Sequence, residues 1–268
     1  MRSQDILAGV DGLPEHEVIR LLVAATGRSR SDVILGFDVS PADRETFDGF
    51  IQRRLGDEPL QYIEGTVPFG PVELHVDHRV LIPRPETEYL FELVTAMARE
   101  PRVIVDLCTG SGNLALALAR TFPSAEVYAV DVSEAAVSVA ERNAADNRLN
   151  VAVLVGDLFD ALPCGIRGTV DVLVSNPPYL AAGERADLPA DVLAEPDMAL
   201  VAGEHGDEVL ARIAASAVDW LAPGGLIACE ISEFRGEEAA RLFERYDAMI
   251  HRDLTGRDRY VIGRLRFR

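Results

Sequence analysis

The feature that most constrains the fold is the segment VIVDLCTGSGNLALALA, which begins at Val103. It opens as a short apolar run typical of a buried strand, and an apolar helical pattern resumes at Asn113. Between the two runs, Gly110, Gly112 and Ala115 satisfy the pattern G-x-G-x-x-G/A. Glycines there allow a tight turn and let a ligand approach the backbone closely. The segment therefore predicts the first strand, loop and helix of a nucleotide-binding domain, although a glycine turn that only packs strand on helix has the same pattern.

Apolar runs of strand length alternate with amphipathic helical segments from residue 102 onward. Because short connections between alternating strands and helices give a parallel sheet covered on both faces, the pattern predicts an α/β fold with a doubly wound, Rossmann-like sheet. Seven strands are expected, at residues 103–107, 126–130, 151–155, 170–175, 226–231, 249–253 and 260–266.

The first 57 residues are helical and lack this alternation. Helices predicted over residues 14–26 and from Ser40 to Gly56 each carry one apolar stripe. Short apolar runs broken by glycine and proline from 62 to 83 predict a hairpin. We therefore expect an N-terminal helical domain at 1–57, a β-hairpin linker at 58–85 and the α/β domain at 86–268.

Composition narrows the class of partner. The chain carries 44 acidic and 26 basic side chains, a formal net charge of −18, whereas phosphate binding normally needs a basic face. It has no run of 18 apolar residues and no charged-then-apolar leader. Three scattered cysteines, Cys108, Cys164 and Cys229, give no disulfide or metal-ligand spacing. We expect a cytoplasmic, monomeric protein without a metal, for which membranes are excluded and nucleic acid is disfavoured.

An acidic residue follows the glycine loop at the distance that nucleotide binding requires. Asp131 stands 19 positions after Gly112, at the end of the second predicted strand. There its carboxylate can accept both hydroxyls of a ribose. NAD and S-adenosylmethionine both present a ribose to that strand, so the loop and Asp131 fit either one.

The third strand is followed by a second acidic residue. Asp157 can take the amino group of an adenine while an apolar neighbour, Leu158 or Phe159, covers the ring. An equally good interpretation is that Asp157 caps a turn and that Phe159 belongs to the core.

The fourth strand ends abruptly in Asn176-Pro177-Pro178-Tyr179. Prolines cannot donate to a sheet ladder, so the strand stops and places Asn176 at its carboxyl end, where open α/β sheets bind ligands. A dehydrogenase has no evident need for this sequence, whereas an enzyme that methylates an amino or amide nitrogen does. The pattern therefore favours S-adenosylmethionine over NAD.

The reason is geometric. Methyl transfer from a sulfonium is an in-line displacement, and a planar amide nitrogen is a poor nucleophile because its lone pair is delocalised. The Asn176 side-chain carbonyl and the Pro177 backbone carbonyl can accept both N–H bonds and orient that nitrogen, while Tyr179 offers a ring for stacking. Holding reactants in attack geometry lowers a barrier by roughly 7–11 kcal/mol, so positioning can supply most of the catalysis.

These motifs together resemble a known family. DLCTGSGNLALALA from Asp106, Asn-Pro-Pro-Tyr from Asn176 and LIPRPETE from Leu81 are similar to the HemK/PrmC protein-glutamine N5-methyltransferases. The likeness extends to PLQYIEG from Pro59, to Glu195-Pro196 with Ala199-Leu200, and to DLTGRDR from Asp253. The resemblance implies a class I methyltransferase that converts S-adenosylmethionine to S-adenosylhomocysteine. It also implies a peptide chain release factor as partner, modified at the glutamine of its Gly-Gly-Gln loop.

The resemblance also implies site residues. Substrate contacts and catalysis would come from Asn176, Pro177 and Tyr179, with Pro178 beside them. Cofactor contacts would come from Arg84, Glu86, Thr87, Asp106, Cys108, Thr109, Gly110, Ser111, Gly112, Asn113, Asp131, Val132, Asp157, Leu158 and Asn176.

Three departures from the family pattern leave the acceptor open. Cys108 stands where glycine is usual, the segment from Glu230 to Gly236 carries Ser232 and Arg235 in place of the usual glycine and glutamine, and the first helix begins PEHE. The leading hypothesis is methylation of a release factor glutamine. The alternatives are the same chemistry on a small-molecule acceptor, a nucleic-acid amino methyltransferase, or a cofactor-binding protein without activity.

Overall fold

The structure, a computed structural model, describes residues 2–266. It divides into two compact units, Met1–Thr66 with Pro189–Ala194, and Val67–Leu188 with Glu195–Arg268. The division near residue 66 falls within the segment expected to be a linker, whose limits at 58 and 85 stay predictions. Within the described residues no helix is both long enough and apolar enough to cross a bilayer.

The first unit is a group of short helices whose apolar faces meet. The helices expected over 14–26 and 40–56 are present, and the second begins at a cap in which the Ser40 side chain accepts from a backbone N–H. Leu22 and Phe47 are fully buried where these two helices pack. The helices are α1 (Ser3–Ala8), α2 (Glu15–Thr26), α3 (Arg30–Leu35), α4 (Pro41–Leu55), α5 (Leu60–Glu64) and α9 (Ala190–Leu193).

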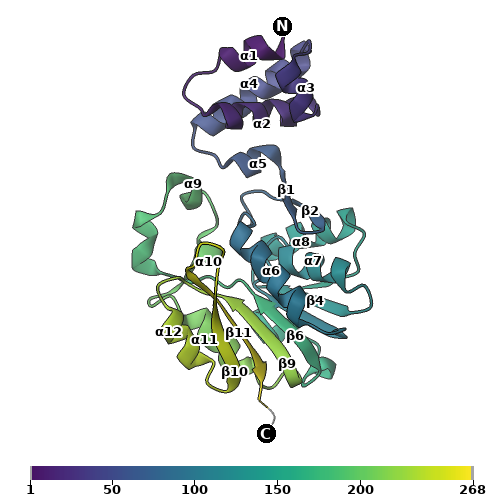
Figure 1. The fold of residues 1–268 in the computed structure, drawn as a ribbon, viewed down its shortest axis with the longest axis vertical. Coiled ribbons are helices and arrows are strands. Elements are labelled where there is room, and N and C mark those ends of the chain that lie inside the picture. The colour runs from purple at the N-terminus through teal and green to yellow at the C-terminus, as the bar shows by residue number, and fades with distance from the viewer. Residues whose placement is uncertain (1, 267–268) are drawn as a thin grey trace. The chain divides into compact units, whose positions relative to one another are not determined.

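The second unit is built on a seven-stranded sheet in the order β10-β11-β9-β6-β3-β4-β5 (Figure 1). The five strands from β9 to β5 run parallel, and β11 is antiparallel to both of its neighbours. This confirms the predicted α/β sheet. The strands are β3 (Val103–Leu107), β4 (Glu126–Asp131), β5 (Ala152–Val155), β6 (Val170–Ser175), β9 (Leu221–Glu230), β10 (Tyr246–Arg252) and β11 (Asp258–Leu265).

Helices cover both faces of the sheet, as the doubly wound prediction requires. Successive side chains of a strand point to opposite faces, so Ile104 packs with helices α6 and α7 while Val105 packs with α11 and α12. The longer helices of the second unit are α6 (Pro85–Met97), α7 (Asn113–Thr121), α8 (Glu134–Asp146), α11 (Glu208–Ala217) and α12 (Gly236–Leu242). Shorter elements are η1 (Leu158–Ala161), η2 (Cys164–Ile166), β7 (Leu180–Ala181), η3 (Ala182–Asp187), α10 (Asp197–Leu200) and β8 (Val201–Gly203).

One strand begins earlier than its pattern indicates. The strand expected to begin at residue 226 starts at Leu221, so the turn-forming sequence Pro223-Gly224-Gly225 lies inside β9. Leu221 pairs with Val170, but the next paired residue of β9 is Leu226. The turn therefore survives as a bulge, because proline and glycine interrupt a ladder without ending the strand.

Two asparagines bind the hairpin to the sheet domain, Asn143 of α8 and Asn147 just after it, and of these Asn143 is the fully buried one. Strands β1 (Thr66–Phe69) and β2 (Val72–His75) pair with each other. The buried Asn143 of α8 accepts from the His75 N–H at 2.7 Å and donates to the His75 carbonyl at 3.0 Å. The same amide nitrogen donates to the carbonyl of Ser111 at 2.8 Å. Asn143 therefore ties β2 to the glycine loop.

Candidate active site

A cavity of about 670 Å³ lies at the carboxyl ends of β3, β4, β5 and β6. This is the edge at which open α/β sheets bind ligands. Most of the residues that the sequence proposes for the site line it. They are Arg84, Thr87, Cys108, Thr109, Gly110, Ser111, Asn113, Asp131, Val132, Asp157, Leu158, Asn176 and Pro178.

The glycine loop owes its shape to left-handed backbone conformations. Cys108, Gly110 and Gly112 have φ values of 59°, 55° and 85°. At Gly110 no atom lies within 4 Å of where a Cβ would stand, so the loop is open to a ligand. At Gly112 a Cβ would come within 3.2 Å of Leu116 and 3.3 Å of Ala140, so a side chain there would have to displace these neighbours as well as adopt φ 85°. Gly112 does not line the cavity.

Asp106 supports the loop from behind and does not line the cavity. One of its carboxylate oxygens accepts from the Thr109 hydroxyl at 2.5 Å and the Ala115 N–H at 3.1 Å. Its other oxygen, Oδ1, is buried and has no hydrogen-bond partner among the described residues. Burial raises the pKa of Asp106 to about 7. A cationic group near the loop would satisfy Oδ1 and favour the ionised form.

Asp131 lies at the end of β4 with both oxygens already engaged. Oδ2 accepts from the Gly110 N–H at 2.8 Å and Oδ1 from the Ser133 N–H at 2.9 Å. Burial raises its pKa above the ordinary value. Each carboxylate oxygen has a second lone pair, so Asp131 can still accept two hydroxyl groups from a ligand.

The segment after β5 separates into a cavity-lining part and a core part. Leu158 has φ 53° and lines the cavity. Phe159 is buried and stacks on Trp220 with ring centroids 5.7 Å apart, so it belongs to the core. Asp157 lines the cavity and forms an ion pair with Arg212 of α11 at 2.8 Å, which leaves its other oxygen available.

Asn176 follows β6 and is held by groups behind it. Its Nδ2 donates to the Thr87 hydroxyl at 3.0 Å, and that hydroxyl donates to Glu230 Oε2 at 2.7 Å. Thr87 and Glu230 are 0% and 2% exposed. No hydrogen bond to Asn176 Oδ1 is present among the described residues, so this oxygen remains available at a residue that lines the cavity.

Pro177 and Tyr179 do not line the large cavity. They line a separate space of about 10 Å³, together with Glu230 and Arg235. Arg235 donates to the Tyr179 carbonyl at 3.1 Å, and burial raises the pKa of the Tyr179 phenol. The stacking and acceptor roles expected of Pro177 and Tyr179 stay predictions.

Arg84 and Glu86 have different surroundings. Arg84 lines the cavity and is paired with the Glu195 carboxylate, whose side chain is 1% exposed. Glu195 also accepts from the Ile82 N–H at 3.2 Å, so it fixes the chain before α6. Glu86 does not line the cavity, and its backbone carbonyl accepts from the Tyr260 hydroxyl at 2.7 Å.

Several charged residues at or behind the site were not expected from the sequence: Arg79, Glu195, Asp197, Arg212 and Glu230. Glu195 had a signal, since Glu195-Pro196 is part of the family likeness. Glu230 had one too, an acidic residue at the end of the apolar run LIACE. Arg212 had none, because it lies on a helix 55 positions from its partner Asp157. Within the described part of the chain no three His, Cys, Asp or Glu side chains are grouped so as to hold a metal ion.

Comparison with known proteins supports the resemblance. Residues 4–65 match the PrmC N-terminal domain and residues 87–205 the methyltransferase small domain. A release factor glutamine methyltransferase of Deinococcus radiodurans is 39% identical over 265 residues, which covers 96% of this chain and 93% of that protein. One from Mycolicibacterium smegmatis is 40% identical over 262 residues, covering 95% and 91%.

A solved methyltransferase from Pyrococcus furiosus has the same fold. Its TM-score is 0.54 at 21% sequence identity, and the match covers 73% of this chain and 90% of that one. The class I methyltransferase fold expected from the resemblance is thereby confirmed. With the identities above and the N-terminal domain in place, the chain belongs to the family of release factor glutamine methyltransferases.

Proposed function

We propose that the protein transfers a methyl group from S-adenosylmethionine to the side-chain amide nitrogen of a glutamine, in the Gly-Gly-Gln loop of a peptide chain release factor. Family membership supports the reaction class and the acceptor. The single observation that carries the proposal is the state of Asn176, whose amide nitrogen is engaged by Thr87 while Oδ1 remains available beside the cavity.

The donor set at the cavity fits this cofactor. Asp131 can accept the ribose hydroxyls, and Gly110 leaves its backbone open to a ligand. Asp157 and Leu158 offer a polar and an apolar contact for an adenine. When bound, S-adenosylmethionine supplies a methyl carbon made electrophilic by a sulfonium, and S-adenosylhomocysteine is the product.

The residues of the chain act by orienting the acceptor. Asn176 Oδ1 and the Pro177 carbonyl would each accept one N–H of the glutamine amide. Gripping both hydrogens favours a tetrahedral nitrogen with a localised lone pair. No strong base is needed, because this nitrogen becomes acidic only as the new N–C bond forms and the S–C bond breaks, after which it can release one proton to water. Positioning of this kind can lower the barrier by roughly 7–11 kcal/mol.

A methylation assay with a matched pair of variants tests the proposal. The protein is incubated with methyl-labelled S-adenosylmethionine and purified release factor, and label in the release factor is counted. We expect label with the wild type and at least a 10²-fold lower rate with Asn176→Ala, since removal of one oriented polar group costs about 10²–10³ in rate. Asn150→Ala, an exposed asparagine elsewhere in the chain, is the control. Equal rates in Asn176→Ala and the wild type would refute the assignment.

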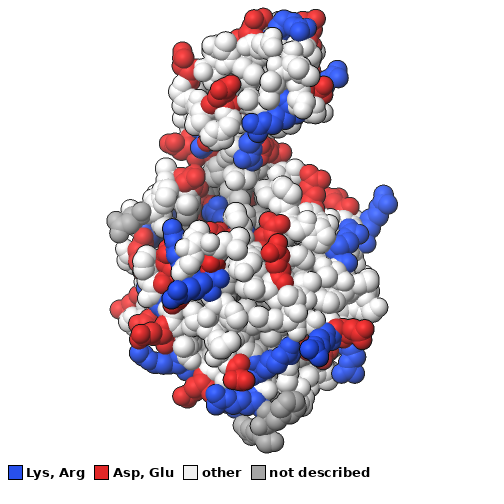
Figure 2. Space-filling view, viewed as in Figure 1, with Lys and Arg blue, Asp and Glu red and all other residues white. Residues whose placement is uncertain are grey.

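The other acceptors have less support. The departures at Ser232 and Arg235 do not line the cavity: Ser232 is buried, and Arg235 contacts Tyr179 and Glu184. They line the small space beside Pro177 and Tyr179, so it is family membership, and not these two positions, that favours a protein acceptor over a small molecule. A nucleic-acid acceptor is disfavoured by the net charge of −18, and Figure 2 shows acidic and basic side chains interspersed over the face in view.

A further inference from the structure

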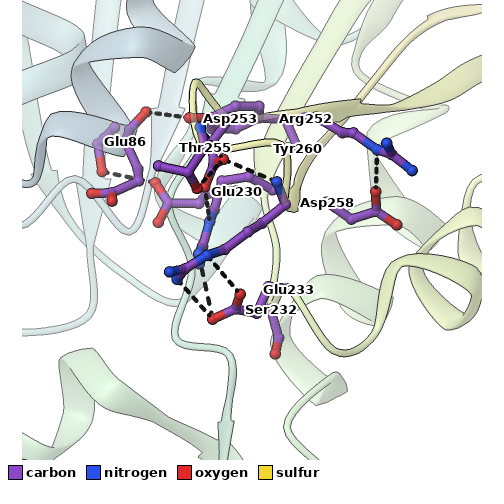
Figure 3. A network of polar contacts seen from close by, with 12 residues as sticks. Glu86, Glu230, Ser232, Glu233, Arg252, Asp253, Thr255, Asp258 and Tyr260 are labelled. Atoms are coloured by element: carbon purple, nitrogen blue, oxygen red, sulfur yellow. Dashed lines mark hydrogen bonds and ion pairs between the residues drawn. The ribbon is translucent and has the colours of Figure 1, made fainter.

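Three side chains form a hydrogen-bonded chain that leads away from the cavity. They come from separate parts of the second unit: Asn176 after β6, Thr87 in the first turn of α6 and Glu230 at the end of β9. The Nδ2-to-hydroxyl distance is 3.0 Å and the hydroxyl-to-carboxylate distance is 2.7 Å. Figure 3 shows Glu230 within a polar network that also contains Glu86, Asp253 and Tyr260.

The direction of this chain is fixed by the number of available hydrogens. A threonine hydroxyl has one hydrogen to donate and two lone pairs. An ionised carboxylate can only accept, so the hydrogen of Thr87 goes to Glu230. The hydroxyl must then accept from its other neighbour, and only the NH₂ of Asn176 can donate. The Asn176 carbonyl oxygen is thereby turned away from Thr87.

We propose that Thr87 and Glu230 are positioning residues that present the oxygen of Asn176, and not its NH₂, to the acceptor amide, and that they do so only while Glu230 is ionised. The inference deepens the proposed function and rests on it for the identity of the acceptor. Neither residue would touch the reacting atoms. Both would act through the orientation of Asn176.

Protonation of Glu230 would reverse the chain. A neutral carboxyl can donate to Thr87, and Thr87 can then donate to Asn176 Oδ1. The amide would turn over and present NH₂ to an acceptor amide that itself needs to donate two N–H bonds. The NH₂ of Asn176 and an N–H of the acceptor amide would then face each other as two donors. The acceptor nitrogen would lose one of the two hydrogen bonds that orient it.

The surroundings of Glu230 place this switch in an accessible pH range. Burial raises its pKa to about 7, against the hydrogen bond from Thr87, which lowers it. The charged groups that face it are Arg259 on β11, which lowers the pKa, and Glu86 and Arg84 near the start of α6, which respectively raise and lower it. The phenols of Tyr179 and Tyr260 also lie near Glu230. The carboxylates of Glu233 and Asp253 form ion pairs with Arg259.

Three variants separate positioning from packing. Thr87→Val keeps the volume but removes the hydroxyl, and we expect its kcat to fall about 10²-fold, the cost of misplacing a reacting group. The Kd for S-adenosylmethionine should change far less than kcat, because Thr87 is 0% exposed and its hydroxyl is bound to Glu230. Thr87→Ser restores the hydroxyl and should recover activity to within a few-fold. Thr95→Val is the control, because Thr95 lies on the same helix and its buried hydroxyl has no partner among the described residues.

Glu230→Gln tests the requirement for ionisation. Its side-chain oxygen can still accept from Thr87, but it cannot be protonated near neutral pH. We expect the wild-type rate to fall as pH drops below about 7 and the variant to lose this acid limb while keeping activity at higher pH. An unchanged acid limb in Glu230→Gln would overturn the proposal.

A measurement independent of turnover is the side-chain ¹⁵N–¹H resonance of Asn176, assigned by its loss in Asn176→Ala. We expect it to titrate with pH in the wild type, to be flat in Glu230→Gln and to shift in Thr87→Val but not in Thr95→Val. A wild-type resonance in Thr87→Val would refute the proposal. If the resonance behaves as expected but no release factor is methylated, the proposed function fails while the positioning role stands. If the release factor is methylated at the wild-type kcat by Thr87→Val, the positioning role fails alone.

Discussion

Replacement of Asn143 by alanine should destabilise the second unit. The loss should be larger than that from replacing any other polar side chain that binds the hairpin. The substitution removes three hydrogen bonds, of 2.7, 3.0 and 2.8 Å, to the backbone of His75 and Ser111. Asn143 is fully buried, so its partners would lose hydrogen bonds that water does not readily replace. At about 1 kcal/mol for each bond, the free energy of unfolding should fall by about 3 kcal/mol.

Asn147 offers the matched comparison one helical turn away. Asn147 donates to the carbonyls of Glu73 and Asn143 at 2.7 and 2.9 Å and accepts from the Glu73 N–H at 3.4 Å. It is only part-buried, so water can replace these contacts. Asn147→Ala should therefore cost at most about 1 kcal/mol. Urea unfolding followed by circular dichroism measures both variants. A loss in Asn143→Ala no larger than in Asn147→Ala would refute the assignment of Asn143 as the fastening between hairpin and glycine loop.

Three further predictions concern the site and its support. Arg235→Gln removes the guanidinium that donates to the Tyr179 carbonyl and should lower the free energy of unfolding by about 1 kcal/mol. The Kd for S-adenosylmethionine, measured by calorimetry, should not change, because Arg235 does not line the cavity. Cys108→Gly should leave the free energy of unfolding within about 1 kcal/mol of the wild type, because relief of the backbone strain at φ 59° offsets the greater freedom of glycine in the unfolded chain. Cys108→Val should be clearly less stable, and thermal melts measure both variants. Burial raises the pKa of both Glu230 and Asp106 to about 7, so the folded protein holds these protons more tightly than the unfolded chain and loses stability as pH rises from the ordinary carboxyl range to 7. Glu230→Gln should therefore lose less stability than the wild type between pH 5 and 8, and equal slopes in urea unfolding at each pH would contradict this.

The sequence could predict the parts of the site that depend on local pattern. Gly110 and Asp131 were expected at the ends of adjacent strands, and the structure places both at the cavity because parallel strands end at one edge of the sheet. Asn176 was located in the same way, by the prolines that end its strand. These predictions needed only the chain direction and the spacing of apolar runs.

What a pattern cannot supply is the direction of each side chain and the partners that tertiary packing brings. Pro177 follows Asn176 directly, yet it lines a different space. From the sequence, Phe159 fits an adenine contact and a core position equally well. Its stacking on Trp220, 61 positions away, places it in the core. Glu230 lies 143 positions from Thr87, and no local pattern joins residues so far apart.

The proposed reaction is methyl transfer to a glutamine nitrogen that Asn176 orients. The most direct measurement is tandem mass spectrometry of release factor peptides after incubation with trideuteromethyl-labelled S-adenosylmethionine, with wild type and Asn176→Ala in parallel. We expect a single labelled methyl group on the glutamine of the Gly-Gly-Gln peptide with the wild type and none with the variant, while both bind the cofactor. An unlabelled peptide from the wild type, or an equally labelled one from Asn176→Ala, would contradict the account.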